Sequence, residues 1–300
     1  MLTIIMKQAL FTGTSVAIVT PFKNDGRIDF DKFKELVEFH AENGTNSITV
    51  AGTTGECSTL TDDEQIELIE KCVEYVNGRM TVIAGTGSND TMHGIKLSKA
   101  AEKAGADALL VVTPYYNKTS QYGLVKHYLQ IADSVNIPII LYSVPSRTGM
   151  TIGVDALKKL SEHPLINGLK DANSNFEQLL ATIHACGDNL NIWSGNDTEI
   201  VPMMALGAKG VISVWANINP KAVLRVTDAC INGDYAYATK LQADAYELLK
   251  ALFVETNPIP VKAAMNLMGF EVGEPRMPLC EIGEQNKELL INSLKRYKMI

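Results

Sequence analysis

The sequence has 300 residues, of which 46% are hydrophobic and 20% are charged, and it contains no low-complexity tract. Such a chain can bury a large core, as one large domain or two ordinary ones. The formal net charge of -7 and the lack of long basic clusters argue against partners such as nucleic acid or a membrane surface.

The five cysteines are dispersed, odd in number and without a C-x-x-C pair, a pattern typical of a reducing compartment. The apolar run before Lys7 is too short for a signal-peptide core, and no later run approaches the length of a membrane span. We therefore expect a cytoplasmic protein.

Short β-rich runs recur along the chain at residues 15–20, 47–52, 81–85, 108–113, 138–144, 166–170, 191–195 and 210–214. The segments between them have helical periodicity, as in Phe33, Leu36, Val37 and His40. This alternation predicts an α/β fold with a parallel sheet, and eight apolar strands favour closure into a (β/α)8 TIM barrel. An open doubly wound sheet is the alternative, but no Gly-x-Gly-x-x-Gly follows the first strand.

Capping sequences at the expected helix starts support the predicted helices. S/T-x-x-E sequences at 61–64 and 174–177 predict capping boxes, and Asn219 followed by Pro220 predicts another helix start. After residue 214 the chain is mostly helical. We expect a barrel at residues 1–230 that carries the active site, and a C-terminal helical extension at residues 231–300 packed on it.

In such barrels the chemistry lies at the C-terminal ends of the strands. The segments expected there offer hydroxyls, phenols, one guanidinium and one amine: GTTGE (52–56), GTG (85–87), TPYYN (113–117), YSVPSRTG (142–149) and Lys170.

Lys170 ends the sixth strand without basic neighbours. It could be an ordinary surface lysine that pairs with Asp171. Alternatively, burial of the amine would lower its pKa, so that the neutral form could attack a carbonyl carbon and form an imine. In an extended strand Ile166, Gly168 and Lys170 share one face, and Gly168 would leave room for a ligand.

Imine chemistry needs a proton relay, and Tyr142 is the candidate, although it could instead be a core aromatic residue. Thr53 and Thr54 could hold a small carboxylate through hydroxyls and backbone amides, or could simply form a glycine-flanked turn. Arg147 could bind a second carboxylate, or could be a solvated surface charge.

A metal site is poorly supported, because the histidines show neither H-x-H nor H-E-x-x-H spacing. They are His40, His93, His127, His163 and His184. We expect no metal and no cofactor.

The segments GTTGE, VTPYYNK, LYSVPSRTG, GLKDA, GVISVWAN and NPIPVKAAMN closely resemble, in order and spacing, the dihydrodipicolinate synthase (4-hydroxy-tetrahydrodipicolinate synthase) family. The resemblance runs from Phe11 into the C-terminal helices. The lysine barrel alone would indicate only the wider pyruvate-dependent class I aldolase superfamily. The resemblance implies a lyase that joins pyruvate to L-aspartate 4-semialdehyde through a Schiff base on Lys170, in diaminopimelate and lysine biosynthesis.

The resemblance also implies that Tyr142 relays protons with Thr53 and with Tyr116, the latter supplied by a neighbouring subunit. The family is usually a homotetramer built from tight dimers. Three further residues are expected around the substrates: Thr54 and Ile212 at pyruvate, and Arg147 at the semialdehyde carboxylate.

Many family members are inhibited by lysine, and this chain departs from the sensitive pattern. Cys57, Asp62 and Gln65 stand where a serine and two histidines are expected, and His93 replaces a glutamate. We predict weak or absent inhibition by lysine; strong inhibition at low lysine concentration in a rate assay would contradict this.

Two other functions are possible. N-acetylneuraminate lyase, or a 2-keto-3-deoxy sugar-acid aldolase, shares the lysine and the tyrosine, but Arg147 argues against it. A non-catalytic sensor of small acids would require the loss of a catalytic group, yet the lysine, tyrosines and threonines are all present.

Overall fold

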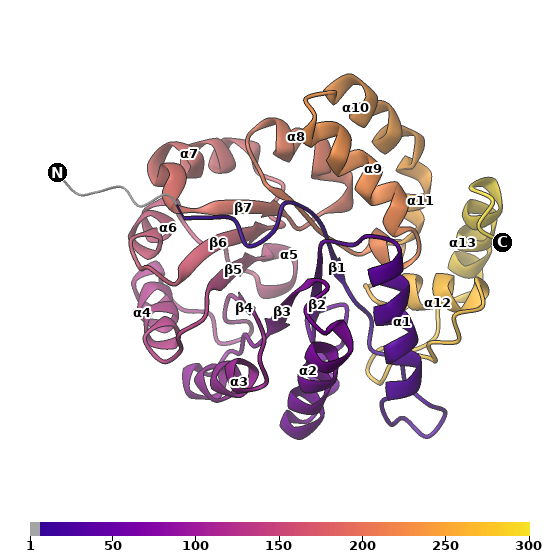
Figure 1. The fold of residues 1–300 in the computed structure, drawn as a ribbon, viewed down its shortest axis with the longest axis horizontal. Coiled ribbons are helices and arrows are strands. Elements are labelled where there is room, and N and C mark those ends of the chain that lie inside the picture. Colours follow the sequence, from indigo (N-terminus) through magenta and orange to yellow (C-terminus); the bar gives the residue numbers. More distant parts are fainter. Residues whose placement is uncertain (1–6) are drawn as a thin grey trace.

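The computed structural model describes residues 7–300 and contains a closed barrel of eight parallel strands in chain order (Figure 1). The predicted apolar run before Lys7 lies outside the described residues. The strands are β1 (Gly13–Ala17), β2 (Ser47–Val50), β3 (Thr81–Gly85), β4 (Ala108–Val112), β5 (Ile139–Ser143), β6 (Ile166–Asp171), β7 (Asn191–Ser194) and β8 (Gly210–Ser213). The predicted (β/α)8 barrel is confirmed, and the open sheet is wrong.

Helices follow the strands and surround the barrel (Figure 1). They are α1 (Phe30–Glu42), α2 (Asp62–Val76), α3 (Thr91–Lys103), α4 (Gln121–Ala132), α5 (Pro145–Thr148), α6 (Val154–Ser161), α7 (Phe176–Cys186), α8 (Ile200–Ala205), α9 (Pro220–Ile231), α10 (Tyr235–Asp244), α11 (Tyr246–Ala251), α12 (Ile259–Leu267) and α13 (Glu284–Arg296).

The strands are apolar along their whole length because both of their faces are buried. One cluster of buried side chains fills the barrel interior and includes Ile83, Leu110, Ile140 and Trp193. A larger cluster lies between strands and helices; the buried face of α1 consists of the predicted positions, Phe33, Leu36, Val37 and His40. Each buried Leu or Ile contributes about 1.5–3 kcal/mol through removal from water.

The predicted face of β6 needs a correction. Ile139 pairs with Ile166, but the next residue, Ile140, pairs with Gly168, so the register shifts by one residue. Because this irregularity breaks the two-residue alternation, Ile166 packs in the outer cluster and does not share the inner face with Lys170.

The expected room for a ligand beside Gly168 is also wrong. A Cβ atom at Gly168 would lie 2.4 Å from Cζ3 of Trp193 and 2.6 Å from the carbonyl oxygen of Asn191. Trp193 stacks on Phe11, with ring centroids 5.0 Å apart, and donates its indole N–H to the Phe11 carbonyl. The space left by the absence of a side chain at Gly168 is therefore filled by the Trp193 indole of the barrel core.

Helix starts agree with the sequence except at α7. Thr61 and Glu64 form the predicted capping box of α2, and Asn219 caps α9. At α7 the N-cap is Asn175, whose side chain accepts from the backbone N–H of Gln178, so the capping box predicted at 174–177 is wrong by one residue.

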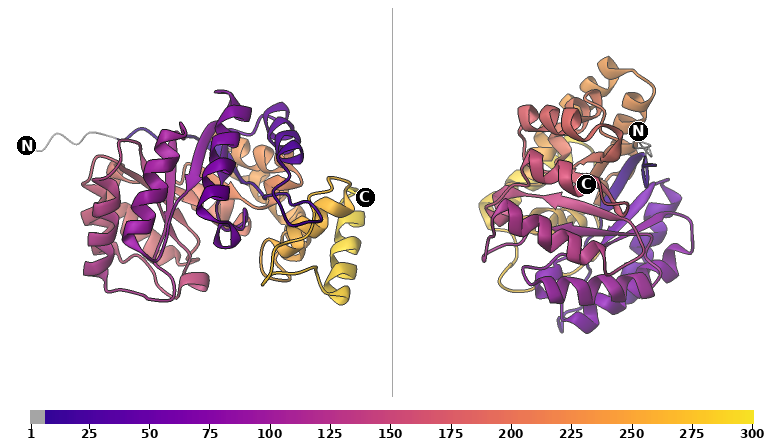
Figure 2. Two further views of the ribbon diagram at one scale, coloured as in Figure 1. Left: turned by 90° about the horizontal axis from the view of Figure 1, so that it is seen from below. Right: turned by 90° about the vertical axis from the view of Figure 1, so that its left-hand side faces the viewer.

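Helices α10–α13 follow the barrel, and the last of them gather on one side of the molecule (Figure 2). Phe270, just after α12, packs edge-on against Phe39 of α1, with ring centroids 5.1 Å apart. The division into domains at residues 230 and 231 stays a prediction. Within residues 7–300, no helix is both long and apolar enough to span a membrane.

Candidate active site

Lys170 lies near the C-terminal end of β6, and its side chain is only 6% exposed. Its Nζ atom lies 4.3 Å from the centroid of the Tyr142 ring, because Tyr142 and Lys170 are register partners on β5 and β6. Burial lowers the pKa of Lys170 to about 7; the Asp197 carboxylate opposes this shift and Arg147 adds to it. The amine is therefore partly neutral near pH 7, as nucleophilic attack requires.

Tyr142 is buried, and burial raises the pKa of its phenol, while positive charge on Arg147 and a hydrogen-bonding contact with the Thr53 side chain oppose the rise. The phenol is thus protonated at neutral pH and can act as a donor and an acceptor of protons. The sequence-predicted lysine, tyrosine and threonine come together in one place.

Thr54 and Arg147 meet at a residue that the sequence analysis did not assign. The Asn257 side-chain amide donates to the Thr54 hydroxyl at 2.9 Å, and the backbone carbonyl oxygen of Asn257 accepts from Nη2 of Arg147 at 2.9 Å. Asn257 begins the segment NPIPVKAAMN. The prolines of that segment were the sequence feature that could have drawn attention to Asn257.

Asp197, just after β7, is a second residue that sequence reasoning missed. It is 2% exposed, and its Oδ2 accepts from the backbone N–H groups of Val214 at 3.1 Å and Trp215 at 2.9 Å. These bonds join the end of β7 to the end of β8. The sequence SGND places this carboxylate shortly after a barrel strand, and that position could have identified Asp197 as a candidate site residue.

A cavity of about 170 Å³ joins the predicted residues described so far and Asn257, whereas Asp197 does not line it. Its lining includes Thr53, Thr54, Tyr142, Arg147 and Lys170. A neighbouring cavity of about 270 Å³ shares Thr53 and Arg147 and extends to Tyr115.

Two predicted site residues lie apart from this cavity. Ile212 is fully buried in the barrel interior, in the same cluster as Tyr142, and does not line the cavity. Tyr116 is 94% exposed, with a backbone φ of 68°, and its side chain lies on the surface of the chain.

Among residues 7–300, no three His, Cys, Asp or Glu side chains are grouped as metal ligands. His40 packs inside the helical layer, where burial lowers its pKa to about 3, and His127 bonds to the Thr91 hydroxyl at 2.9 Å. The hydrogen bond to Thr91 gives His127 a structural partner, and complete burial gives His40 a place in the core.

Three of the residues that the resemblance ties to lysine inhibition have polar partners within the chain. His93 Nε2 lies 2.8 Å from Asp62 Oδ1, and Lys96 Nζ lies 2.6 Å from Asp62 Oδ2. The Gln65 amide donates to the Gly85 carbonyl at 2.8 Å. Weak or absent inhibition by lysine stays a prediction.

Comparisons with known proteins agree with this geometry. The sequence model of the Dihydrodipicolinate synthetase family matches residues 10–297. A 4-hydroxy-tetrahydrodipicolinate synthase from Clostridium novyi is 50% identical over 290 residues, 97% of this chain and 98% of that protein. One from Acetivibrio thermocellus is 50% identical, over 98% of this chain and all of that protein.

A crystal structure of the chloride-inhibited dihydrodipicolinate synthase from Acinetobacter baumannii, complexed with pyruvate, has a TM-score of 0.94 to this chain. It is 45% identical and covers 97% of this chain and all of that one.

A closed (β/α)8 barrel with a buried amine and a phenol together at its rim defines an enzyme of the Schiff-base-forming lyase and aldolase class. Within that class, the family match and the relatives place the chain plainly: it belongs to the dihydrodipicolinate synthetase family.

Proposed function

We propose that this chain is a 4-hydroxy-tetrahydrodipicolinate synthase, which condenses pyruvate with L-aspartate 4-semialdehyde in diaminopimelate and lysine biosynthesis. The carrying observation is the buried Lys170 amine, with a pKa of about 7, whose Nζ lies 4.3 Å from the Tyr142 ring. The names of the relatives and the pyruvate in the solved A. baumannii structure supply the substrate class.

In the proposed reaction, neutral Lys170 attacks C2 of pyruvate to give a carbinolamine, and loss of water gives an imine on Nζ. Removal of a proton from C3 of pyruvate then yields an enamine, which attacks the aldehyde carbon of the semialdehyde, and the resulting alkoxide takes up a proton. Attack of the semialdehyde amino group on the imine carbon closes the ring and displaces the Lys170 amine, which regenerates the enzyme. We assign the proton transfers to Tyr142, which contacts Thr53. No metal or cofactor is needed, because the imine nitrogen itself withdraws electrons from C2.

The remaining proposed roles follow the chemistry of each side chain. Thr54 would bind the pyruvate carboxylate through hydroxyl and amide donors, and Arg147 would bind the semialdehyde carboxylate at the mouth of the cavity. Ile212 would form apolar surface beneath pyruvate, although it packs in the barrel interior here.

Tyr116 would complete the proton relay only from a second subunit. Its exposure of 94% is consistent with a residue that serves a neighbour, and we propose a homodimer or homotetramer on that basis. Analytical ultracentrifugation would test the assembly; a monomer with full activity would exclude a required contribution from Tyr116 of another subunit.

The central test is borohydride reduction with pyruvate present, followed by peptide mapping. We expect the adduct on Lys170 and no adduct in Lys170→Met; an adduct on another lysine would contradict the proposed role. Rates with L-aspartate 4-semialdehyde and with N-acetylmannosamine, each alongside pyruvate, separate the proposed activity from a sugar-acid aldolase. Faster turnover of N-acetylmannosamine would overturn the assignment.

A further inference from the structure

A fully buried ion pair involves Glu56, the last residue of the GTTGE segment. Nζ of Lys262, in α12, lies 2.9 Å from Oε1 of Glu56, and both side chains are completely inaccessible to solvent. The same ammonium donates to the carbonyl oxygens of Thr20, at 3.0 Å, and Glu274, at 3.1 Å. One amine thus joins the end segments of β1 and β2 to the C-terminal part of the chain.

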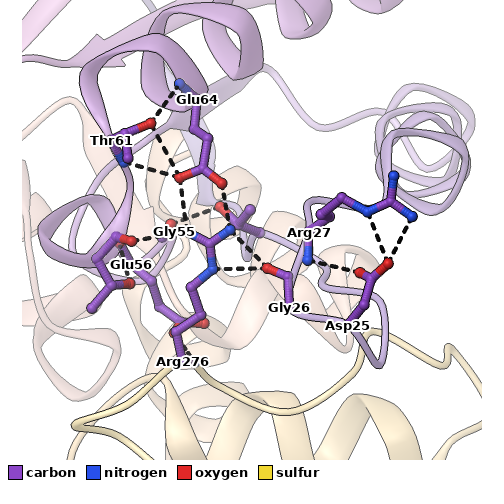
Figure 3. Close-up of polar contacts among 10 residues, drawn as sticks. Asp25, Gly26, Arg27, Gly55, Glu56, Thr61, Glu64 and Arg276 are labelled. Carbon is purple, nitrogen blue, oxygen red and sulfur yellow. Dashed lines mark hydrogen bonds and ion pairs between the residues drawn. The ribbon is translucent and has the colours of Figure 1, made fainter.

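The second carboxylate oxygen of Glu56 is also used. It accepts from the backbone N–H of Arg276 at 2.9 Å (Figure 3). The Arg276 guanidinium binds both carboxylate oxygens of Glu64 and donates to the Gly26 carbonyl (Figure 3). It also donates to the Thr59 carbonyl. Glu56 and Glu64 therefore both attach to the 262–276 region, but only Glu56 belongs to GTTGE.

The backbone of the 262–276 region approaches the barrel rim closely. Gly273 has a φ of +72°, and a Cβ atom there would lie 2.0 Å from the Phe22 carbonyl oxygen. The Phe22 ring contacts both cations, at 4.3 Å for Lys262 Nζ and 4.4 Å for Arg276 Cζ. The contact is therefore built from backbone, aromatic and charged groups together.

Further contacts and an unusual backbone conformation are found within GTTGE itself. Glu56 has a left-handed backbone, with a φ of 58°, which is unfavourable for a residue with a side chain. The Gly55 carbonyl accepts from the Thr20 hydroxyl at 2.6 Å, and the Thr54 hydroxyl accepts from Asn257. Thr54 is thus held through its own hydroxyl by Asn257 and through the following residues by the contacts of Gly55 and Glu56.

We infer that Glu56 and Lys262 are positioning residues for pyruvate binding: their buried pair fixes GTTGE so that the hydroxyls and amides of Thr53 and Thr54 face the Lys170 cavity. This inference deepens the proposed function and rests on it. Stability alone is a weak explanation, because a buried ion pair contributes little compared with apolar side chains of similar volume.

The test compares Glu56→Asp with Glu64→Asp. Each change keeps the charge and moves one carboxylate attached to the 262–276 region by one methylene, but only the first acts on GTTGE. We expect Glu56→Asp to raise the KM for pyruvate about tenfold, with the KM for the semialdehyde within about twofold of wild type. Glu64→Asp should leave both KM values within about twofold.

A second variant removes the ammonium. Lys262→Met should raise the pyruvate concentration needed for half-maximal borohydride trapping by at least about tenfold. The pH midpoint of trapping should stay unchanged, since Lys170 keeps its surroundings. A purely structural role would lower the melting temperature and affect all kinetic constants alike. If Lys262→Met does not fold, Glu56→Asp, which retains both charges, decides the question.

The inference is overturned if folded Glu56→Asp has the wild-type KM for pyruvate, or if Glu64→Asp changes it equally. Neither outcome contradicts the proposed function if the wild type condenses the two substrates. If the wild type traps pyruvate but does not consume the semialdehyde, the proposed activity is wrong. The pyruvate dependence of trapping in the variants then still tests the role of the Glu56–Lys262 pair.

Discussion

The rate of imine formation should follow the titration of Lys170. Burial lowers the pKa of Lys170 to about 7. The Asp197 carboxylate raises this pKa, and the Arg147 guanidinium lowers it further. The neutral amine is the reactive form, so the rate of imine formation with pyruvate should rise as the pH increases through about 7 and then level off.

The magnitude follows from the same value. With a pKa of about 7, about half of the amines are neutral at pH 7 and about one tenth at pH 6. An ordinary lysine, with a pKa of 10.5, would have only about one amine in 3,000 neutral at pH 7. Burial thus increases the concentration of nucleophile about 1,500-fold at pH 7.

The assay mixes enzyme with saturating pyruvate, quenches aliquots with borohydride over time and counts the adduct by intact-protein mass spectrometry, between pH 5.5 and 9. Asp197→Asn removes a charge that favours the ammonium form, so its midpoint should move to lower pH. Arg147→Met removes a charge that disfavours the ammonium form, so its midpoint should move to higher pH. A wild-type midpoint near 10, or shifts of both variants in one direction, would refute the electrostatic reasoning.

Three further substitutions have expected outcomes. Lys170→Met should abolish imine trapping and raise the free energy of unfolding by up to about 5 kcal/mol at pH 7, because the unfolded state binds the proton more tightly; urea titrations should find a smaller gain towards pH 10.5. Tyr142→Phe should lower kcat about 10²-fold or more in steady-state assays, with pyruvate trapping still detectable. Gly168→Ala should destabilise the protein by about 1–3 kcal/mol in urea because the methyl would overlap Trp193, whereas Gly52→Ala, whose methyl meets Thr49 Cγ2 at 3.8 Å, should cost less.

The barrel could be predicted because its signals are local. Each strand is a short apolar run, and each helix repeats its buried positions every three or four residues, as α1 does. The pairing of Tyr142 with Lys170 then follows from topology, since parallel neighbouring strands end at the same rim. The position of each residue at a strand end was therefore enough to predict that the amine, the phenol and Thr53 lie close together.

Other features had no local signal. The register shift between β5 and β6 reverses the face expected for Ile166, because a two-residue period cannot reveal an extra residue. The filling of the space at Gly168 by Trp193 depends on the next strand. Glu56 and Lys262 are 206 residues apart, so neither residue alone predicts the pair, although both stand in segments that carry the family resemblance.

The two buried lysines at this rim show why burial alone does not define a nucleophile. Burial lowers the pKa of both amines, but Lys262 has Glu56 at 2.9 Å and two carbonyl acceptors, which use all three of its N–H groups. No hydrogen-bond acceptor contacts Lys170 Nζ within the described chain; its neighbours are the face of the Tyr142 ring and the more distant Asp197 charge. An amine saturated by acceptors keeps its proton and orders the backbone, whereas an amine beside a ring can release its proton and use the freed electron pair to attack pyruvate.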